Sequence, residues 1–497
     1  MSTAPSTCRS DDTRGGWCRR LVLIATVVTA LAVSGVAGTV GAPAVGAQSN
    51  FTFTGGGWGH GVGMSQWGAR GLAANGRNHQ QILTHYYTGT AVSNHAVSND
   101  LRVLLTERTG TVTVVTTGVT AVVDIGTVGA GATLRFTRSG SSMVVSGALN
   151  GSSTRPMDVV FFAPVNVSPP GYTYRYGRLS VRVDPAGGVR AILGELSMQE
   201  YLYGIGEMPS SWPAEALKAQ ATASRTFAQK RRAERTDSKD FDLYGSVMHQ
   251  AYTGTRFEAT AWTNAVDATA GQVVTYGGGL IDAVYSASSG GHTENSEIVW
   301  VSPVPYLKGV PDPYDADGGN PNGSWSRTYS GAQLGSWFGL GTVTDVRILG
   351  NTGTSGRVDK ATVRLTGTGG TRDVPGATFR STVNSRSPGS QLLSTKFGIG
   401  TATGSSSRQA TGDFHTALAD GRKVIVGGRA SDPDGQPLVR VVSTMGSQRA
   451  VREMRAIDGH FLMSWTGAPG TRNVCVTVFD QPSGQAVPLG CRDIVVK

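Results

Sequence analysis

Residues 207–220 read EMPSSWPAEALKAQ, which joins one acid to a proline-flanked turn and the start of a helix. Ser211 can cap a helix start, and Pro213 is well tolerated in a first helical turn. The residues that follow are mostly small, so the predicted helix over 214–232 can pack closely against neighbours on more than one side. The stretch therefore predicts a central helix with Glu207 at its entrance.

The setting of Glu207 is apolar, with Ile205, Met208 and Trp212 close in sequence. An apolar environment raises the pKa of a carboxyl group and keeps it protonated, as a general acid must be. The alternative is an ordinary loop acid without a chemical role. Glu215 fits a structural role, because an acid in the first turn suits the helix dipole.

A second segment, residues 57–69, reads GWGHGVGMSQWGA. Glycine permits unusual backbone angles and close approach of a ligand, and it leaves His60 uncovered for hydrogen bonding or proton transfer. Trp58 and Trp67 are candidates for stacking on sugar rings. The alternative is a tight packing loop with a solvent-facing histidine.

A third segment, residues 286–294, reads SASSGGHTE. A Ser/His hydrolase is conceivable, but the chain lacks a Gly-x-Ser-x-Gly elbow. A backbone-rich turn that lines a site is the better interpretation. His249 and His292 could meet as metal ligands, but matching cysteine or carboxylate spacing is missing, so neither a metal site nor a cofactor is predicted.

The remaining pattern indicates an α+β protein that is rich in strands. Glycine is abundant, at 69 residues, and alternates with valine and threonine in turn-rich stretches. Helices are predicted over 64–74 and 79–87. Strands are predicted over 101–183, 260–310 and 342–400, the third set including 343–348 and 361–365.

The N-terminal residues 1–47 resemble an export signal, with arginines before an apolar run and small residues at a cleavage position. A retained membrane anchor is the alternative. Residues 1–47 hold four Arg and two Asp, so without them the net charge changes from +10 to +8 (10 − 2). A basic exported protein is drawn to anionic wall polymers. Nucleic acid is a poor alternative partner, since no block of lysine and arginine is present and export argues against it.

The C-terminal part is predicted to be a separate β unit. A Gly/Ser/Thr-rich linker is expected over 404–412, followed by an all-β sandwich over 413–497. Cys475 and Cys491 are the two cysteines beyond the predicted leader, and two cysteines in an oxidising compartment most simply form one disulfide.

The three segments together resemble the SpoIID/LytB family. The resemblance covers most of residues 50–400 and implies one SpoIID/LytB-like domain over 48–403. Its parts are the glycine block (55–90), a β-rich region (100–190), a catalytic helix region (195–315) and a second β-rich region (325–400). In better-known members the glycine block lies near the end of the domain, so a circular permutation is expected here. Residues near 51 and 399 should then be neighbours.

The resemblance implies lytic transglycosylation of peptidoglycan glycan strands, by a protein that is secreted and associated with the cell wall. Glu207 corresponds to the family's catalytic glutamate. Other matching positions would bind or orient sugar: His60, Ser65, Gln66, Arg225, Ser288, Ser289 and His292. Arg225 has the alternative of a buried ion-pair partner.

A second function remains open, because some LytB-type relatives are amidase enhancers. The chain would then bind glycan without cleaving it and stimulate another cell-wall hydrolase. The biological process, sporulation included, is not determined by these residues. The C-terminal part resembles an Ig-like domain, carried by residues 424–434 and 489–492, and this likeness implies no ligand.

Overall fold

The computed structural model describes residues 50–235, 240–317, 319–401, 410–432, 437–456, 459–479 and 486–497. The predicted leader over 1–47, with its alternative of a retained anchor, lies outside these residues, as does most of the predicted linker over 404–412. Within the described ranges, no helix has the length and apolar character needed to cross a membrane. The predicted α+β class with a C-terminal β sandwich is confirmed.

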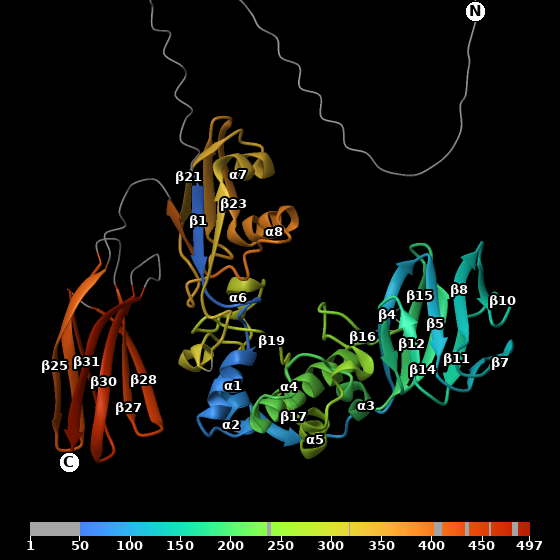
Figure 1. Ribbon diagram of the computed structural model, residues 1–497, viewed down its shortest axis with the longest axis horizontal. Helices are drawn as coiled ribbons and strands as arrows, with labels where there is room; N and C mark the ends of the chain where they lie inside the picture. Colours follow the sequence, from blue (N-terminus) through green and yellow to red (C-terminus); the bar gives the residue numbers. More distant parts are fainter. Residues whose placement is uncertain are drawn as a thin grey trace, which may run out of the picture. The chain divides into compact units, whose positions relative to one another are not determined.

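Helix α4 (Ala214–Ala233) is the central element of the helical part of the chain (Figure 1). Ten consecutive residues, Ala219 to Ala228, are buried. Because this run exceeds two helical turns, every face of the helix is covered. The small side chains predicted from the sequence therefore let α4 pack against several neighbours at once.

The start of α4 differs from the prediction. Ser211 does not cap the helix, because the N-cap residue is Pro213, which makes no side-chain cap. The N–H of Trp212 donates instead to the carbonyl of Pro209, so the preceding residues form a separate turn. The carboxylate of Glu215 accepts hydrogen bonds from the backbone and ring of His79, which ties α4 to α2 (His79–Tyr86).

Short helices and strands surround α4. The prediction of strands over 260–310 was wrong at its start, where α5 forms because Trp262, Ala265 and Val266 bury one helical face. The helices and 3-10 turns are α1 (Gln66–Ala74), α2 (His79–Tyr86), α3 (Met198–Tyr203), η1 (Gly254–Phe257), α5 (Thr260–Ala268), α6 (Ser296–Val299) and η2 (Pro313–Ala316). The strands form two small sheets: β2 (Met64–Ser65) with β19 (Tyr285–Ser286), and β3 (Ala91–Asn94) with β17 (Gln272–Tyr276) and β18 (Gly279–Leu280).

Two sheets form the β-rich part predicted over 101–183, and their strands pair antiparallel except for the parallel pair of edge strand β16 with β4. Apolar residues alternate along the strands, as Val112 and Val114 do in β5, so one face of each strand enters the core. The larger sheet follows the order β16 (Leu243–Tyr244), β4 (Leu101–Thr109), β15 (Val189–Leu196), β14 (Arg178–Val183), β11 (Met157–Phe161), β6 (Thr120–Val122) and β7 (Gly126–Val128). The smaller sheet follows the order β10 (Gly151–Ser153), β9 (Ser142–Gly147), β8 (Thr133–Ser139), β5 (Thr111–Thr116), β12 (Val165–Ser168) and β13 (Tyr172–Tyr174).

A third part combines two three-stranded sheets with two helices around its own core. The sequence predicted strands here and missed helix α8, in which Phe379 and Val383 are buried one turn apart. The sheets are β20 (Trp325–Ser330), β1 (Asn50–Gly55) and β24 (Phe397–Thr401), and β21 (Val343–Leu349), β22 (Thr362–Gly367) and β23 (Gly370–Pro375); the helices are α7 (Gly331–Phe338) and α8 (Gly376–Arg386).

Strand β1 joins the beginning of the described chain to strands from much later in the sequence, so its blue ribbon lies among orange and yellow ones in Figure 1. It pairs antiparallel with β24, and Phe53 lies opposite Ile399. The expectation that residues near 51 and 399 are neighbours is confirmed. The circular permutation itself stays a prediction.

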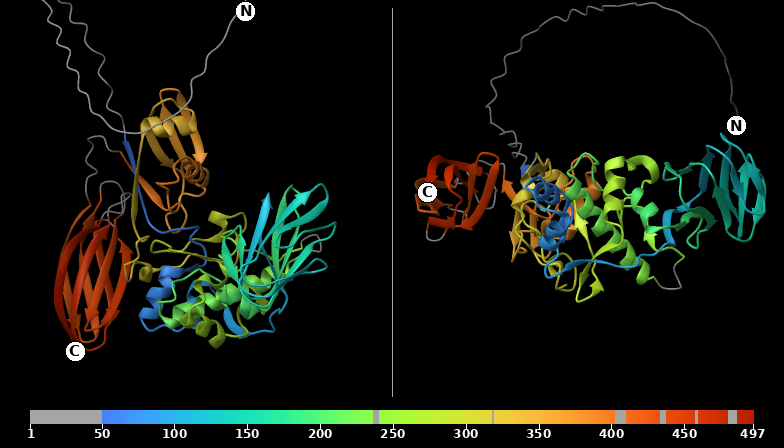
Figure 2. Two further views of the ribbon diagram at one scale, coloured as in Figure 1. Left: turned by 45° about the vertical axis from the view of Figure 1, so that its right-hand side comes forward. Right: turned by 90° about the horizontal axis from the view of Figure 1, so that it is seen from below.

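The C-terminal strands form a sandwich of two sheets around a separate core, and Figure 2 shows these strands in two views. One sheet has the order β25 (Thr411–Asp420), β26 (Lys423–Ser431) and β29 (His460–Thr466). The other has the order β28 (Gln448–Arg455), β27 (Leu438–Met445), β30 (Gly470–Phe479) and β31 (Ala486–Val496).

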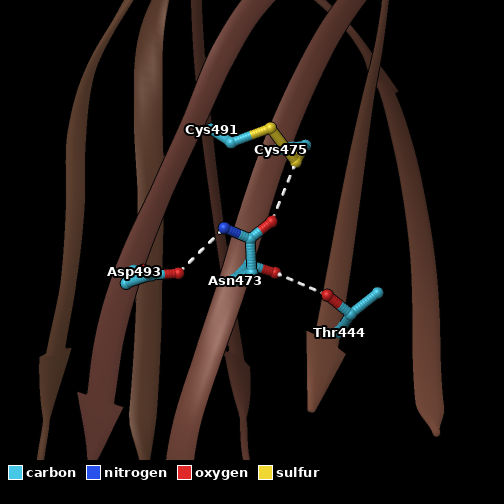
Figure 3. The surroundings of a disulfide bond; sticks show 5 residues. All are labelled: Thr444, Asn473, Cys475, Cys491 and Asp493. Carbon is cyan, nitrogen blue, oxygen red and sulfur yellow. Dashed lines mark hydrogen bonds between the residues drawn. A yellow bond between two sulfur atoms is a disulfide. The ribbon is translucent and has the colours of Figure 1, made fainter. Parts of the chain in front are cut away.

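A disulfide joins Cys475 and Cys491, which lie directly opposite each other on β30 and β31 (Figure 3). Two residues away, the side-chain amide of Asn473 donates to Asp493 on β31, and the backbone carbonyl of Asn473 accepts from the hydroxyl of Thr444 on β27. The crosslink and these polar contacts hold three neighbouring strands of one sheet.

Candidate active site

Glu207 lies in the turn between α3 and α4, where backbone pairing fixes its position. Gly206 donates its N–H to the carbonyl of Ala251, and the N–H of Ala251 donates to Glu207 Oε1 at 2.6 Å. Ile205 and Tyr252 form an isolated antiparallel bridge beside this pair. The acid is therefore held against an extended segment rather than left on a free loop.

The carboxyl group of Glu207 is in a desolvated setting, although the residue as a whole is partly exposed. Burial is the largest influence and raises its pKa, while hydrogen bonds from Ala251, Gln66 and Tyr285 oppose this rise. The net effect is a raised pKa. This favours a neutral carboxyl group that retains a proton to donate.

A buried polar network surrounds Glu207. Gln66 Nε2 donates to the backbone carbonyl of Glu207 at 3.1 Å and to Gln220 on α4 at 3.2 Å. On the other side, the hydroxyl of Tyr285 accepts from Gln250 at 3.0 Å. The sequence predicted Gln66 but missed the other members of the network, which are the buried residues Tyr201, Gln220, Ser224 and Gln250 and the partly exposed Tyr285.

His60 is held neutral near this network. Its Nδ1 accepts the backbone N–H of Val62 at 3.0 Å, and its ring forms a hydrogen bond with the backbone of Tyr285. Burial and the nearby charge of Arg357 lower the pKa of His60 to about 4. Tyr285 therefore connects the two predicted residues, since its backbone contacts His60 and its hydroxyl interacts with Glu207.

The glycine block wraps around the buried side chain of Arg357. Arg357 Nη1 donates to the carbonyl of Gly59 at 2.9 Å. Gly61 has a φ of +73°, and a Cβ there would lie 2.3 Å from the guanidinium group, so only glycine fits. The alternative prediction for this block, a tight packing loop, therefore accounts for the glycine at position 61. His60 nonetheless stays partly exposed, with its ring 5.2 Å from that of Trp300.

Three predicted sugar-binding serines converge on two buried aspartates instead of on solvent. Ser65 and Ser288 donate to Asp315 at 2.6 and 2.7 Å, and Ser289 donates to Asp312 at 2.7 Å. The backbone N–H groups of Ser289 and Gly290 also donate to Asp315, each at 3.0 Å. This cluster, which we call the aspartate tie, fastens the glycine block to the Ser/Gly turn, and the sequence did not reveal either aspartate.

Arg225 and His292 lie outside both groups. Arg225 is fully buried and donates to the carbonyls of Val266 and Gln272, so it fastens α4 to the turn after α5. Of its two predicted roles, the buried one fits these contacts, with carbonyls in place of an ion-pair partner. His292 Nδ1 bonds to the carbonyl of Thr293.

His249 interacts with the backbone N–H of Tyr244 and lies against the rings of Phe227 and Tyr244. It therefore has an aromatic setting of its own. Across the described ranges, no three His, Cys, Asp or Glu side chains are grouped as metal ligands would be.

Residues 187–276 match the family described as stage II sporulation protein, SpoIID. The chain is 39% identical over 150 residues to the amidase enhancer of Bacillus subtilis, an alignment that covers 28% of this chain and 19% of that protein. It is 32% identical over 161 residues to stage II sporulation protein D of the same species, covering 29% and 46%. For stage II sporulation protein D of Bacillus amyloliquefaciens, the identity is 33% over 173 residues, covering 30% and 50%.

The alignments thus span between a fifth and a half of these relatives' own lengths. The family match includes Glu207, the turn before α4, and α4 itself. Residues 187–276 of the chain are therefore similar to a SpoIID domain.

Proposed function

We propose that this protein acts on the bacterial cell wall as a lytic transglycosylase that cleaves peptidoglycan glycan strands, with Glu207 as its general acid. One observation carries the proposal: Glu207 is a partly exposed residue whose desolvated carboxyl group has a raised pKa and is held in place by the N–H of Ala251. Such a group holds a proton that it can donate, and its orientation is fixed.

The chemistry needs one carboxyl group that acts twice. Glu207 donates its proton to the glycosidic oxygen as the C1–O bond breaks. The sugar's own 6-hydroxyl oxygen then bonds to C1, and the Glu207 carboxylate accepts the hydroxyl proton. The products are a new 4-hydroxyl end and a 1,6-anhydro end, and the acid is regenerated. Ordinary glycosidases need a second carboxylate. Among the described residues, the hydrogen-bond partners of the Glu207 carboxyl group are Ala251, Gln66 and Tyr285, none of which is an acid.

The other predicted residues then act mainly as positioning residues. Gln66 holds the backbone of Glu207, and His60 holds the strand residue Tyr285 whose hydroxyl interacts with the acid. The serines and Arg225 are buried and use their polar groups on internal partners. We infer that they stabilise the walls of the site, and that His60 does the same through Val62 and Tyr285, whereas partly exposed His292 remains available to a glycan.

A second candidate function is stimulation of a cell-wall amidase by glycan binding. It is favoured by one specific observation, the 39% identity over 150 residues to a protein named amidase enhancer. In that case the chain would bind glycan strands and recruit another hydrolase without cleaving the glycan itself. The same site residues would then serve recognition alone.

The deciding experiment compares the purified protein with its Glu207→Gln variant on peptide-stripped glycan strands. Glu215→Gln is the matched control, because Glu215 lies on the same segment but is engaged with His79 and Lys218. Mass spectrometry should detect anhydro-muramic acid ends from the parent protein and the control, and almost none from Glu207→Gln. If none of the three proteins cleaves while all bind the strands equally, the enhancer function replaces the transglycosylase.

A further inference from the structure

An exposed aromatic side chain packs against the residue that precedes the acid. Phe257 ends the short η1 turn, and 43% of its surface is accessible. Its ring packs against Gly206, the residue before Glu207: a Cβ at Gly206 would lie 2.4 Å from the Phe257 ring. Glycine at 206 thus lets a large apolar ring sit next to the acid, open to solvent.

A cation accompanies this ring. The guanidinium of exposed Arg256 lies 5.3 Å from the ring centroid of Phe257 and 6.0 Å from that of Tyr172. Nearby Arg175 is paired with the carboxylate of Glu258. Among the residues that the structure describes, Arg256 has no such acidic partner. Its charge is therefore available to an anion.

The backbone that carries these two side chains is fixed. Gly254 has a φ of +60°, and a Cβ there would lie 2.1 Å from the carbonyl oxygen of Thr173 on β13. The hydroxyl of Thr255 also donates to that carbonyl, at 3.3 Å. Because η1 is packed this closely on β13, Phe257 and Arg256 form a preorganised ledge, which lowers the entropy cost of binding.

We propose that this ledge, made of Phe257 and Arg256, is a subsite for a muramic acid residue of the glycan strand. The Phe257 ring would stack on the apolar face of the sugar, and Arg256 would pair with the carboxylate of its lactyl substituent. The proposal rests on the glycan-directed function and adds to it a specificity for the anionic sugar. An uncharged polysaccharide would lack the second contact.

The test uses full-length protein and two substrates: peptide-stripped glycan strands, and the same strands with their carboxylates converted to neutral amides. On the peptide-stripped strands with free carboxylates (native strands), Arg256→Gln should raise KM about tenfold, which corresponds to the loss of one charge-assisted hydrogen bond. On the amidated strands, Arg256→Gln should leave KM unchanged. Phe257→Ala should raise KM on both substrates. Arg175→Gln is the matched arginine control and should behave as the parent protein on both.

Equal KM values for the parent and Arg256→Gln on native strands would overturn the subsite. Its failure is separable from failure of the transglycosylase, because calorimetric binding of native strands can be compared between Glu207→Gln and Glu207→Gln/Arg256→Gln. Weaker binding by the double variant supports the subsite even if no cleavage occurs. Equal binding in this pair refutes the subsite even if the parent protein cleaves.

Discussion

Glu207 and Asp315 are two carboxylates beside the motif segments, and their surroundings differ sharply. Asp315 is almost completely buried and accepts hydrogen bonds from two serine hydroxyls, two backbone N–H groups and the amide of Asn320. Glu207 accepts one backbone N–H at 2.6 Å, lies within reach of Gln66 and Tyr285, and keeps part of its surface open.

The difference shows that two acids near the same motif segments can have different roles. A carboxylate whose acceptor positions are filled by the protein has none left for a substrate, so Asp315 fastens segments together. A carboxyl group that accepts fewer hydrogen bonds in a desolvated place shifts toward its neutral form, and the neutral form has a proton to donate. The number of hydrogen-bond donors around each acid therefore distinguishes Asp315, which joins segments, from Glu207, the proposed general acid.

The largest expected effect is a difference in unfolding free energy between variants of the two aspartates of the aspartate tie. Each Asp315 oxygen accepts a backbone N–H, so Asp315→Asn must place its NH2 group against a fixed donor. We expect a loss of about 2–4 kcal/mol in unfolding free energy, measured by denaturant titration. Asp312→Asn is the matched control, because its partners Tyr86 and Ser289 are hydroxyls that can reverse their bonds. Equal losses in both variants would contradict this assignment.

The next effect concerns stability against pH. Burial and the neighbouring Asp315 raise the pKa of Asp312 to about 7, above the unfolded value of about 3.9. Since the folded state prefers the protonated form, this contribution to stability is fully present below pH of about 3.9 and is lost as pH rises through 7. Asp312→Asn should flatten the fall in melting temperature between pH 5 and 8. Exposed Asp373→Asn should keep the parent slope; matching slopes for Asp312→Asn and the parent would refute the assignment.

A smaller effect compares two helix caps. Ser65 caps α1 by accepting the N–H of Gly68 and also donates to Asp315, whereas Ser330 caps α7 at an exposed position. Ser65→Ala should cost about 2 kcal/mol of unfolding free energy and Ser330→Ala about 1 kcal/mol. If chemical denaturation gives the same cost for both, the contact with Asp315 adds nothing to the cap.

The smallest effect concerns the acid itself. The hydroxyl of Tyr285 lowers the pKa of Glu207, so Tyr285→Phe should raise it further. Because a general acid works only when protonated, cleavage is lost as pH rises through that pKa. The alkaline limb of kcat/KM should therefore move to higher pH in Tyr285→Phe. Tyr276→Phe, at an exposed position on β17, is the control and should leave the limb in place. An unmoved limb in Tyr285→Phe would show that Glu207 is not the titrating acid.

Local patterns were strong enough to predict several elements. Small residues predicted α4 and its packing on several sides, and alternation predicted the β-rich part. Helices α5 and α8 were missed because their buried faces are short, and Ser211 was misplaced because a separate turn precedes Pro213. Strands were predicted wherever valine and threonine were frequent, including places where helices form.

The sequence by itself determined the SpoIID resemblance, the acid at 207 and the nearness of residues 51 and 399, because these depend on motifs and their order. Only the tertiary structure decided which motif residues stay partly exposed and which are buried. The reason is physical: Asp312, Asp315, Tyr285 and Arg357 come from distant segments, and their partners are set by packing and hydrogen-bond geometry across up to 298 residues of separation.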